Sequence, residues 1–245
     1  MNLDFQSISD QGAVRPNNED AIKHGISGSV GWMVIADGMG GHQAGEVASK
    51  LLVDEIEAAV NQLEATHEED YLCFIELELN RANNKIFSMA ESDLSKKGMG
   101  TTAVLVLIFG DQCYLGWVGD SRCYHYKKNE QELVAKTRDH TMVQALFEKG
   151  AITKEEVKTS KRRNMLTRAI GIKKGVKVDT ITFSVESGDI LFLSTDGLHD
   201  NLEKDKLNRS IKKIAQGQDQ TKDLVKLAIQ NESKDNITFG SILIK

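Results

Sequence analysis

The chain has 245 residues, of which 40% are hydrophobic, and it carries a formal net charge of −5. This length allows a substantial core, and the negative charge argues against a surface built to bind nucleic acid. The first residues lack a basic segment followed by an apolar one, and the apolar run from Ala103 to Phe109 is too short to span a bilayer. We therefore expect a soluble, cytoplasmic protein without nucleic-acid or membrane partners.

Strands and helices follow one another along the first half of the chain. Strand-like runs lie near residues 3–9 and 31–36, on either side of a polar segment at residues 15–20. Apolar residues then recur every three or four positions from Ala48 to Leu63 and again from Ile75 to Met89. This spacing predicts two amphipathic helices, each with one apolar face.

The second half is richer in strands. Residues 101–137 contain short β-branched and aromatic runs separated by Gly-Asp and Lys-Asn-Glu breaks, which predict consecutive antiparallel strands. A polar, helix-compatible insertion follows at about residues 139–165. The remaining predictions are strands at 176–185 and 189–194, helices at 203–214 and 221–230, and a final strand at 237–244.

The apolar pattern also predicts how these elements pack. The strands "WMVIA" and "DILFL" are apolar on both faces, so both sides of their sheets must be covered, whereas each helix has only one apolar side. The fold class that satisfies both is α+β, a four-layer α-β-β-α sandwich of two antiparallel sheets flanked by helices. Because no Pro-, Gly- or Ser-rich linker interrupts the chain, we predict a single domain over residues 1–245.

Aspartates stand at the ends of several predicted strands. Two apolar strands end in Asp-Gly pairs, at Asp37 and Asp196. Asp120 ends a third strand, Asp235 precedes the last one, and Asp20 lies just ahead of strand-like sequence. One Asp-Gly pair alone is more often a surface turn. If all five aspartates converge, their mutual repulsion requires a cation. The three cysteines lack C-x-x-C spacing and the histidines lack H-x-x-x-H spacing, so the ligands would be oxygens, which suit Mg²⁺ or Mn²⁺.

This set of carboxylates predicts phosphate chemistry. The number of aspartates suits two ions, which can activate a water and hold the oxygens of a phosphoryl group. Gly38 would let its carbonyl oxygen approach an ion, because it has no Cβ. The planar guanidinium of Arg15 can bind two phosphate oxygens, although by itself an arginine beside Pro16 is more simply a surface residue.

Seven short motifs resemble the metal-dependent Ser/Thr protein phosphatases of type 2C, and in particular their compact bacterial branch. They occur in the same order over nearly the whole chain: "RPNNED" at 15–20, "ADGMGGH" at 36–42, "GMGTTAV" at 98–104, "VGDSR" at 118–122, "LTRAIG" at 166–171, "STDGL" at 194–198 and "KDNIT" at 234–238. The resemblance implies an α-β-β-α catalytic domain that hydrolyses phosphoserine and phosphothreonine in proteins through a water activated by two metal ions.

The resemblance also implies a role for each site residue. Asp37 would bridge the two ions, the Gly38 carbonyl would complete one coordination sphere, and Asp196 and Asp235 would bind the other ion. Asp20 would hold metal-bound waters, and Arg15 would bind the substrate phosphate. Asp120, together with Asp196, would form a third, weaker metal site.

Two departures from the family pattern leave roles open. Animal members have a histidine directly after the Asp-Gly pair, where this chain has Met39. His42 is then a candidate general acid, a metal-bound water is another, and the plain interpretation of His42 is a residue at a helix start. The insertion at 139–165 resembles the mobile flap of the family but lacks the His-Pro pair of many bacterial relatives. Its basic cluster, "KTSKRR" at 158–163, is either a solvated loop or an attraction for acidic phosphopeptides.

Two other functional classes remain open from the sequence. A pseudophosphatase would keep the fold as a phosphoprotein-binding module, but it would be expected to have lost metal-binding aspartates, and none is missing here. A small-molecule phosphatase would use the same site with a different cleft surface. The leading prediction is an enzyme with phosphoprotein substrates and an opposing Ser/Thr kinase.

Overall fold

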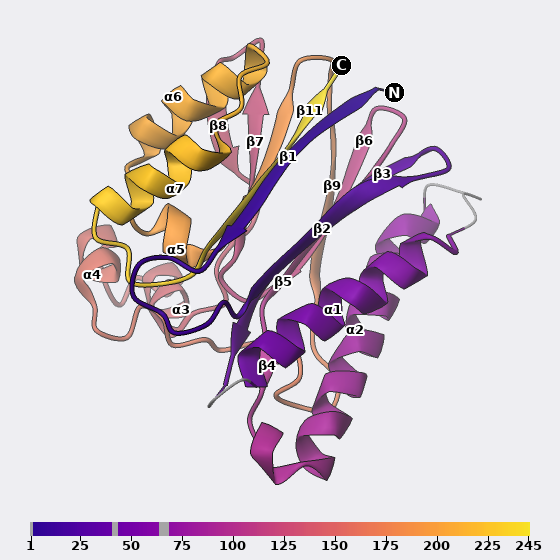
Figure 1. Ribbon diagram of the computed structural model, residues 1–245, viewed down its shortest axis with the longest axis vertical. Helices are drawn as coiled ribbons and strands as arrows, with labels where there is room; N and C mark the ends of the chain where they lie inside the picture. The colour runs from indigo at the N-terminus through magenta and orange to yellow at the C-terminus, as the bar shows by residue number, and fades with distance from the viewer. Residues whose placement is uncertain (1, 41–43, 64–68) are drawn as a thin grey trace.

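Two antiparallel β-sheets lie face to face and carry helices on their outer sides in the computed structural model (Figure 1). The structure describes residues 2–40, 44–63 and 69–245. The four-layer α-β-β-α architecture predicted from the apolar pattern is therefore confirmed. The layers matter for function because they bring the ends of distant strands to one edge of the sandwich.

The first sheet contains both ends of the chain. Its strands, in spatial order, are β1 (Leu3–Asp10), β11 (Ile237–Ile244), β10 (Ile190–Ser194), β7 (Arg122–Lys127) and β8 (Glu132–Ala135). The C-terminal strand β11 lies between β1 and β10, and its pairing with β1 runs from Leu3↔Ile244 to Asp10↔Ile237. This register places the residues just before β11 beside the loop that follows β1.

The second sheet is built from the middle of the chain. Its main strands, in spatial order, are β2 (Asp20–Ser27), β3 (Val30–Met39), β5 (Ala103–Phe109), β6 (Gln112–Val118) and β9 (Asp179–Ser184). The short strand β4 (Gly100–Thr101) pairs with the end of β3. All strand pairings in this sheet are antiparallel.

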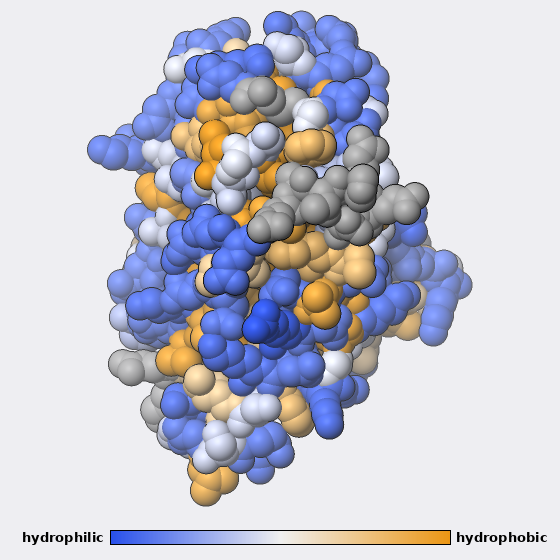
Figure 2. All heavy atoms as spheres, turned by 90° about the vertical axis from the view of Figure 1, so that its right-hand side faces the viewer, coloured by the Kyte–Doolittle hydropathy of each residue, from blue (hydrophilic) through white to orange (hydrophobic). Residues whose placement is uncertain are grey.

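Helices cover the outer face of each sheet. The second sheet is covered by α1 (Ala44–Val60) and α2 (Glu69–Ser92), with the 3-10 turn η1 (Leu94–Lys96) after them. The first is covered by α5 (Asp196–His199), α6 (Lys204–Ala215) and α7 (Thr221–Gln230). The side that carries α1 and α2 is largely hydrophilic in Figure 2. The apolar faces of α1 and α2 pack against the second sheet, and those of α5, α6 and α7 pack against the first.

Strand β3 shows why both faces of the sheets are apolar. Trp32, Val34 and Ala36 point toward α1 and α2, whereas Met33 and Ile35 point into the layer between the sheets. Alternate residues of a strand face opposite sides, so an uninterrupted apolar run fills two core layers at once. Asp37 directly follows this apolar run and therefore lies near the end of a strand that is packed on both faces.

Two boundaries differ from the simplest expectation of an Asp-Gly turn, whereas the insertion is helical in part, as predicted. The Asp37-Gly38 pair does not turn, because β3 continues through it to Met39 and pairs with β4. The Asp196-Gly197 pair begins α5 instead of forming an isolated turn. The insertion contains two short helices, α3 (Met142–Glu148) and α4 (Lys154–Thr159), each preceded by a threonine whose side chain accepts a backbone hydrogen bond.

Candidate functional site

The two aspartates of the second sheet are direct neighbours. Asp20 is the first residue of β2, and it lies opposite Asp37 in the register of β2 with β3. Directly opposed residues in an antiparallel pair have their Cβ atoms about 5 Å apart, and two like charges in that position repel. The fold therefore holds two carboxylates together at the end of a packed strand, where only a compensating positive charge makes their full ionisation favourable.

Two threonines fix the backbone of Asp37. The Asp37 amide donates to Thr102 Oγ1 at 2.9 Å, and Thr101 Oγ1 donates to the Asp37 carbonyl oxygen at 2.9 Å. Thr102 Oγ1 also shares a hydrogen bond of 2.7 Å with the hydroxyl of Ser121, which directly follows Asp120. These hydroxyls link the strand that carries Asp37 to the loop that carries Asp120.

Thr195 connects the two sheets at the site. Its hydroxyl donates to Asp20 Oδ2 at 2.9 Å, although Asp20 and Thr195 stand 175 positions apart in the sequence. The next residue is Asp196, the first residue of α5. A Cβ added to Gly197 would lie 1.9 Å from the carbonyl oxygen of Asn236, so the chain segments that carry Asp196 and Asp235 pass in close backbone contact.

Asn236 anchors the loop that contains Arg15. Its amide donates to the carbonyl oxygens of Gln11 and Asn17, both at 2.9 Å, and its side-chain oxygen accepts from the amide of Glu19. The loop is thus held against the start of β11. Arg15 reaches Asp235 from it, with 2.7 Å between Arg15 Nη2 and Asp235 Oδ2.

The carboxylates perturb one another. Burial raises the pKa of Asp20 to about 7, with the charges of Asp196 and Asp235 adding to the effect. Burial, and then the charges of Asp235 and Asp200, also raise the pKa of Asp196 to about 7. The pKa of Asp37 lies well above its usual range, again through burial first and then through the surrounding aspartates. Without a cation, this cluster retains protons near neutral pH.

Several features of the cluster suit divalent cations. Asp196 Oδ1 is buried and has no hydrogen-bond partner among the described residues. A Cβ at Gly38 would lie 2.5 Å from the Glu19 carbonyl oxygen, so only glycine fits there. Within residues 2–40, 44–63 and 69–245, no three acidic, histidine or cysteine side chains enclose an ion by themselves. Mg²⁺ commonly takes one or two carboxylates and keeps several waters, which agrees with such an open donor set.

Metal stabilisation of the fold should depend on pH. Because their pKa values are raised in the folded state, Asp20 and Asp196 contribute less to the unfolding free energy as pH rises from about 4 toward 7. Mn²⁺ held by these two carboxylates would displace their protons, so its apparent affinity should rise by up to roughly tenfold per pH unit for each proton displaced, and the rise should level off above about pH 7. The increase in melting temperature caused by Mn²⁺ should therefore grow between pH 6 and pH 8, as measured by thermal unfolding with and without the ion.

The control is built into the comparison of the unfolding curves with and without Mn²⁺ at each pH. Groups outside the cluster titrate equally in both samples, so their effect on the melting temperature cancels in the difference. An Mn²⁺-induced shift that is constant between pH 6 and pH 8 would contradict the proton linkage.

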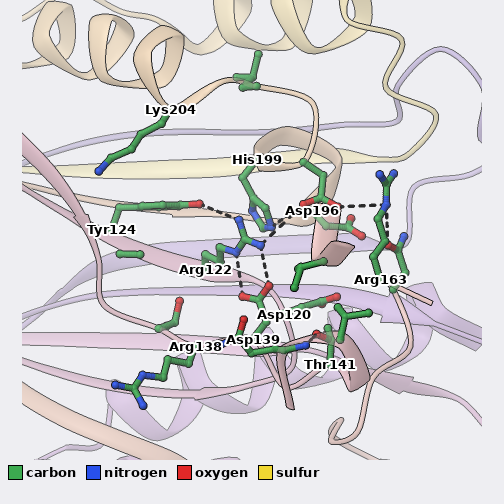
Figure 3. Close-up of a pocket in the computed structure, with 18 of the residues that line it drawn as sticks. Asp120, Arg122, Tyr124, Arg138, Asp139, Thr141, Arg163, Asp196, His199 and Lys204 are labelled. Carbon is green, nitrogen blue, oxygen red and sulfur yellow. Dashed lines mark hydrogen bonds and ion pairs between the residues drawn. The ribbon is translucent and has the colours of Figure 1, made fainter. Parts of the chain in front are cut away.

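Asp120 lies where a cavity meets the cluster. Burial, and next the charge of Asp196, raise the pKa of Asp120 well above its usual range. Asp120 and Asp196 both line a cavity of about 720 Å³ (Figure 3). Its lining also includes Val143 and Phe147 of α3 and Val157 of α4. In the basic segment above it, Arg163 lies 3.8 Å from Asp200, while Lys161 and Arg162 are exposed. His42, the candidate general acid, lies outside the described residues.

The structure thus brings Asp20, Asp37, Asp196 and Asp235 to one edge of the sandwich, with Asp120 and Arg15 beside them. Sequence reasoning missed the hydroxyl and amide groups that position these aspartates: Thr101, Thr102, Ser121, Thr195 and Asn236. Each of them stands within one of the seven motifs, and Ser121, Thr195 and Asn236 are direct sequence neighbours of an aspartate there, whereas the motif of Thr101 and Thr102 contains none. The available signal was their position in those motifs, because their residue types alone are too common.

Comparison with known proteins identifies the family. The model of the protein phosphatase 2C family matches residues 1–237. The protein phosphatase PhpP of Streptococcus pneumoniae is 32% identical over 245 residues, which cover 98% of this chain and 97% of PhpP. A serine/threonine phosphatase of Streptococcus agalactiae has a structure with a TM-score of 0.91 at 30% identity, covering all of both chains.

A further solved structure is informative about the metal. It is the catalytic domain of the serine/threonine phosphatase PstP in complex with two manganese ions, with a TM-score of 0.86 at 29% identity and 99% of both chains covered. The fold and the acidic site are those of a metal-dependent phosphoprotein hydrolase. This chain belongs to the protein phosphatase 2C family. Its activity is accordingly that of a protein serine/threonine phosphatase.

Among the described residues, no helix is both long enough and apolar enough to cross a bilayer.

Proposed function

We propose that the aspartate cluster holds two divalent cations, Mn²⁺ or Mg²⁺, for the hydrolysis of phosphoserine and phosphothreonine. Asp37 and the Gly38 carbonyl would serve one ion, Asp196 and Asp235 the other, and Asp20 would hold coordinated waters. The observation that carries this assignment is the buried, unpartnered Asp196 Oδ1 within a group of carboxylates whose pKa values are raised. Asp120 with Asp196 would provide a third, weaker site.

The cations would activate a water for attack and neutralise charge on the phosphoryl group. The protein itself orients the reactants. Arg15, 44% exposed and paired with Asp235, can turn its remaining N–H groups toward a phosphate entering from solvent. Thr195 and Asn236 keep Asp20 and the Arg15 loop in fixed positions relative to α5, so the phosphate-binding group and the acidic cluster do not drift apart.

Phosphate release from a phosphothreonine peptide, measured while Mn²⁺ is titrated, tests this function. Metal-stripped protein should be inactive, activity should rise with Mn²⁺ or Mg²⁺, and excess EDTA should abolish it, because the aspartates alone cannot neutralise a phosphate. Parallel assays with p-nitrophenyl phosphate distinguish two classes of enzyme. A protein phosphatase should have the higher kcat/KM for the phosphothreonine peptide, whereas a small-molecule phosphatase should have the higher kcat/KM for p-nitrophenyl phosphate. Hydrolysis that persists in excess EDTA would contradict the assignment.

We also propose a setting for the activity. Residues 1–245 would act as one catalytic domain, with about 139–165 as a flap beside the site. The formal net charge of −5 supports a cytoplasmic protein that does not bind nucleic acid or membranes. Phosphoprotein substrates imply an opposing Ser/Thr kinase.

For the general acid we propose His42, with a metal-held water as the alternative proton donor.

A further inference from the structure

A buried histidine lies at the base of the insertion. His140 directly precedes Thr141, the N-terminal cap of α3, and its side chain is only 4% exposed. Its ring stacks on that of Trp117, with 6.1 Å between the ring centroids and 16° between the ring planes. His140 belongs neither to the seven motifs nor to the acidic cluster, so the proposed function leaves its role open.

The segment that contains His140 runs beside the residues that lead to Asp120. The His140 amide donates to the Gly119 carbonyl oxygen at 2.9 Å, and the Gly119 amide donates to His140 Nδ1 at 3.0 Å. Trp117 Nε1 donates to the Arg138 carbonyl oxygen at 2.8 Å. One backbone segment and one imidazole therefore hold the chain immediately before Asp120.

These hydrogen bonds define which nitrogen of His140 carries the proton. A backbone N–H can only donate, so Nδ1 is the unprotonated acceptor of the Gly119 amide. Nε2 lies 3.2 Å from Asp179 Oδ2, and hydrogen bonds from Arg168 lower the pKa of Asp179 to about 2. An ionised carboxylate can only accept, so Nε2 carries the proton and donates it to this hydrogen bond.

The Gly119 amide depends on this acceptor. Gly119 is buried just after the end of β6, and its φ of +106° is one that side chains rarely adopt. A Cβ there would also lie 2.6 Å from Thr102 Cγ2. A buried amide without an acceptor is unfavourable, so the imidazole stabilises the backbone conformation of the residue directly before Asp120.

The same histidine joins the two ends of the insertion. The Thr167 amide, just after the insertion, donates to the His140 carbonyl oxygen at 2.8 Å. At its start, Asp139 accepts two hydrogen bonds from Arg122, at 2.9 and 2.7 Å (Figure 3). The base of the insertion and the loop that carries Asp120 therefore share one set of hydrogen bonds, with His140 at its centre.

We propose that His140 is a positioning residue. Its Nδ1 fixes the Gly119 amide and thereby holds Asp120 in the acidic cluster, while its backbone joins that position to the base of the insertion. The inference rests on the proposed function, because it takes Asp120 as a ligand of the third, weaker metal site. His140 acts on that site through Gly119 and does not itself bind the ion.

Long-range ¹H–¹⁵N correlation spectra of the wild-type protein with Mg²⁺ test the hydrogen bond without any substitution. They should show the His140 tautomer with the proton on Nε2, and the Gly119 amide should exchange slowly with solvent. A proton on Nδ1 would overturn the proposal, because Nδ1 could not then accept from Gly119. A freely exchanging Gly119 amide would overturn it as well.

Two variants separate the roles of the two nitrogens. In His140→Asn, the side-chain oxygen can take the place of Nδ1 and accept from Gly119, whereas the contact with Asp179 is lost. In His140→Gln, the side-chain amide nitrogen can take the place of Nε2 and donate to Asp179, whereas Gly119 loses its acceptor. Each variant gives up the stacked ring and one hydrogen bond, so a merely structural role predicts similar losses in both.

The Gln variant should be the impaired one. Partners that position a metal ligand typically contribute 10- to 100-fold, so His140→Gln should bind its weakest Mn²⁺ ion about tenfold less tightly in a calorimetric titration with Mn²⁺ alone. It should also lose about tenfold in kcat on a phosphothreonine peptide, with little change in KM. His140→Asn should keep most of both quantities. Equal values in the two variants, or a larger loss in His140→Asn, would overturn the proposal.

His125→Gln is the matched control. His125 is another buried histidine, 1% exposed, whose Nε2 lies 2.8 Å from Asp189 Oδ2 and whose ring packs against Phe183. The same substitution there should keep the wild-type kcat and Mn²⁺ affinity, and a loss equal to that of His140→Gln would contradict a specific role for His140. If the wild type hydrolyses no peptide with Mn²⁺, the proposed function fails, whereas the tautomer and the Mn²⁺ titrations still decide the role of His140.

Discussion

Replacing Asp37 by asparagine is expected to reduce kcat/KM by on the order of 10³-fold, which corresponds to ~4 kcal/mol of transition-state stabilisation. Asp37 lies opposite Asp20, and its pKa is raised well above the usual range by burial and by the surrounding aspartates. An amide of the same shape keeps the side-chain volume but cannot provide the negative charge that a bridging ligand requires. Steady-state kinetics on a phosphothreonine peptide at saturating Mn²⁺ measure this loss.

The same variant should fold at least as stably as the wild type in the absence of metal. Removing one carboxylate from the cluster relieves repulsion that the metal-free protein otherwise relieves by binding protons. Thermal unfolding should show an unchanged or higher melting temperature without Mn²⁺ and a smaller increase when Mn²⁺ is added.

Asp111→Asn is the matched control for this variant, since Asp111 is exposed in the turn between β5 and β6 and should affect neither activity nor the Mn²⁺ response. Turnover close to that of the wild type in Asp37→Asn would contradict a ligand role.

The fold could be predicted from the sequence because each apolar strand packs on both faces, and its uninterrupted apolar pattern shows that both faces are covered. In β10, Ile190 and Phe192 pack under α6 and α7, while Leu191 and Leu193 fill the space between the sheets. A pattern apolar on both alternate faces leaves few architectures other than a covered sandwich. The order of strands within each sheet did not follow from this pattern, because it depends on pairings such as β1 with β11 that join opposite ends of the chain.

The acidic residues of the site were visible for a different reason. An aspartate at the end of a buried apolar run is carried to the sheet edge whatever the details of the loop, so Asp37 and Asp196 could be selected from local sequence. Their hydrogen-bond partners could not, because the contact of Thr195 with Asp20 and those of Asn236 with residues 11–19 depend on how distant segments meet. Threonine and asparagine are too common in loops to be selected without the fold.

The cavity was not predictable from the sequence either. Residues of α3, α4, β7 and β8 line it together, and a one-dimensional pattern contains no information about unfilled space. The helical tendency of the insertion and the apolar character of Phe147 are both evident in the sequence. That these side chains surround a space beside Asp120 follows only from the packing of several elements that are distant in the sequence.

Replacing Gly38 by alanine is expected to lower the free energy of unfolding by about 3 kcal/mol and to weaken the stabilisation by Mn²⁺. The added Cβ would lie 2.1 Å from the Gly45 carbonyl oxygen and 2.5 Å from that of Glu19. Both obstacles are backbone atoms, so no side-chain rotation relieves the clash, and the end of β3 that carries Asp37 must move away from α1. Urea unfolding with and without Mn²⁺ measures both effects.

The matched control is Gly110→Ala, which separates crowding from backbone conformation. Gly110 has a φ of +59° and no atom within 4 Å of the place that a Cβ would take, so alanine there should cost only the strain of the left-handed conformation, about 1 kcal/mol. Gly38 lacks such a positive φ, and its cost comes from the close approach of β3 to α1. If Gly38→Ala were as stable as Gly110→Ala and kept the full Mn²⁺ response, the close backbone contact could not be what positions Asp37 near the end of β3.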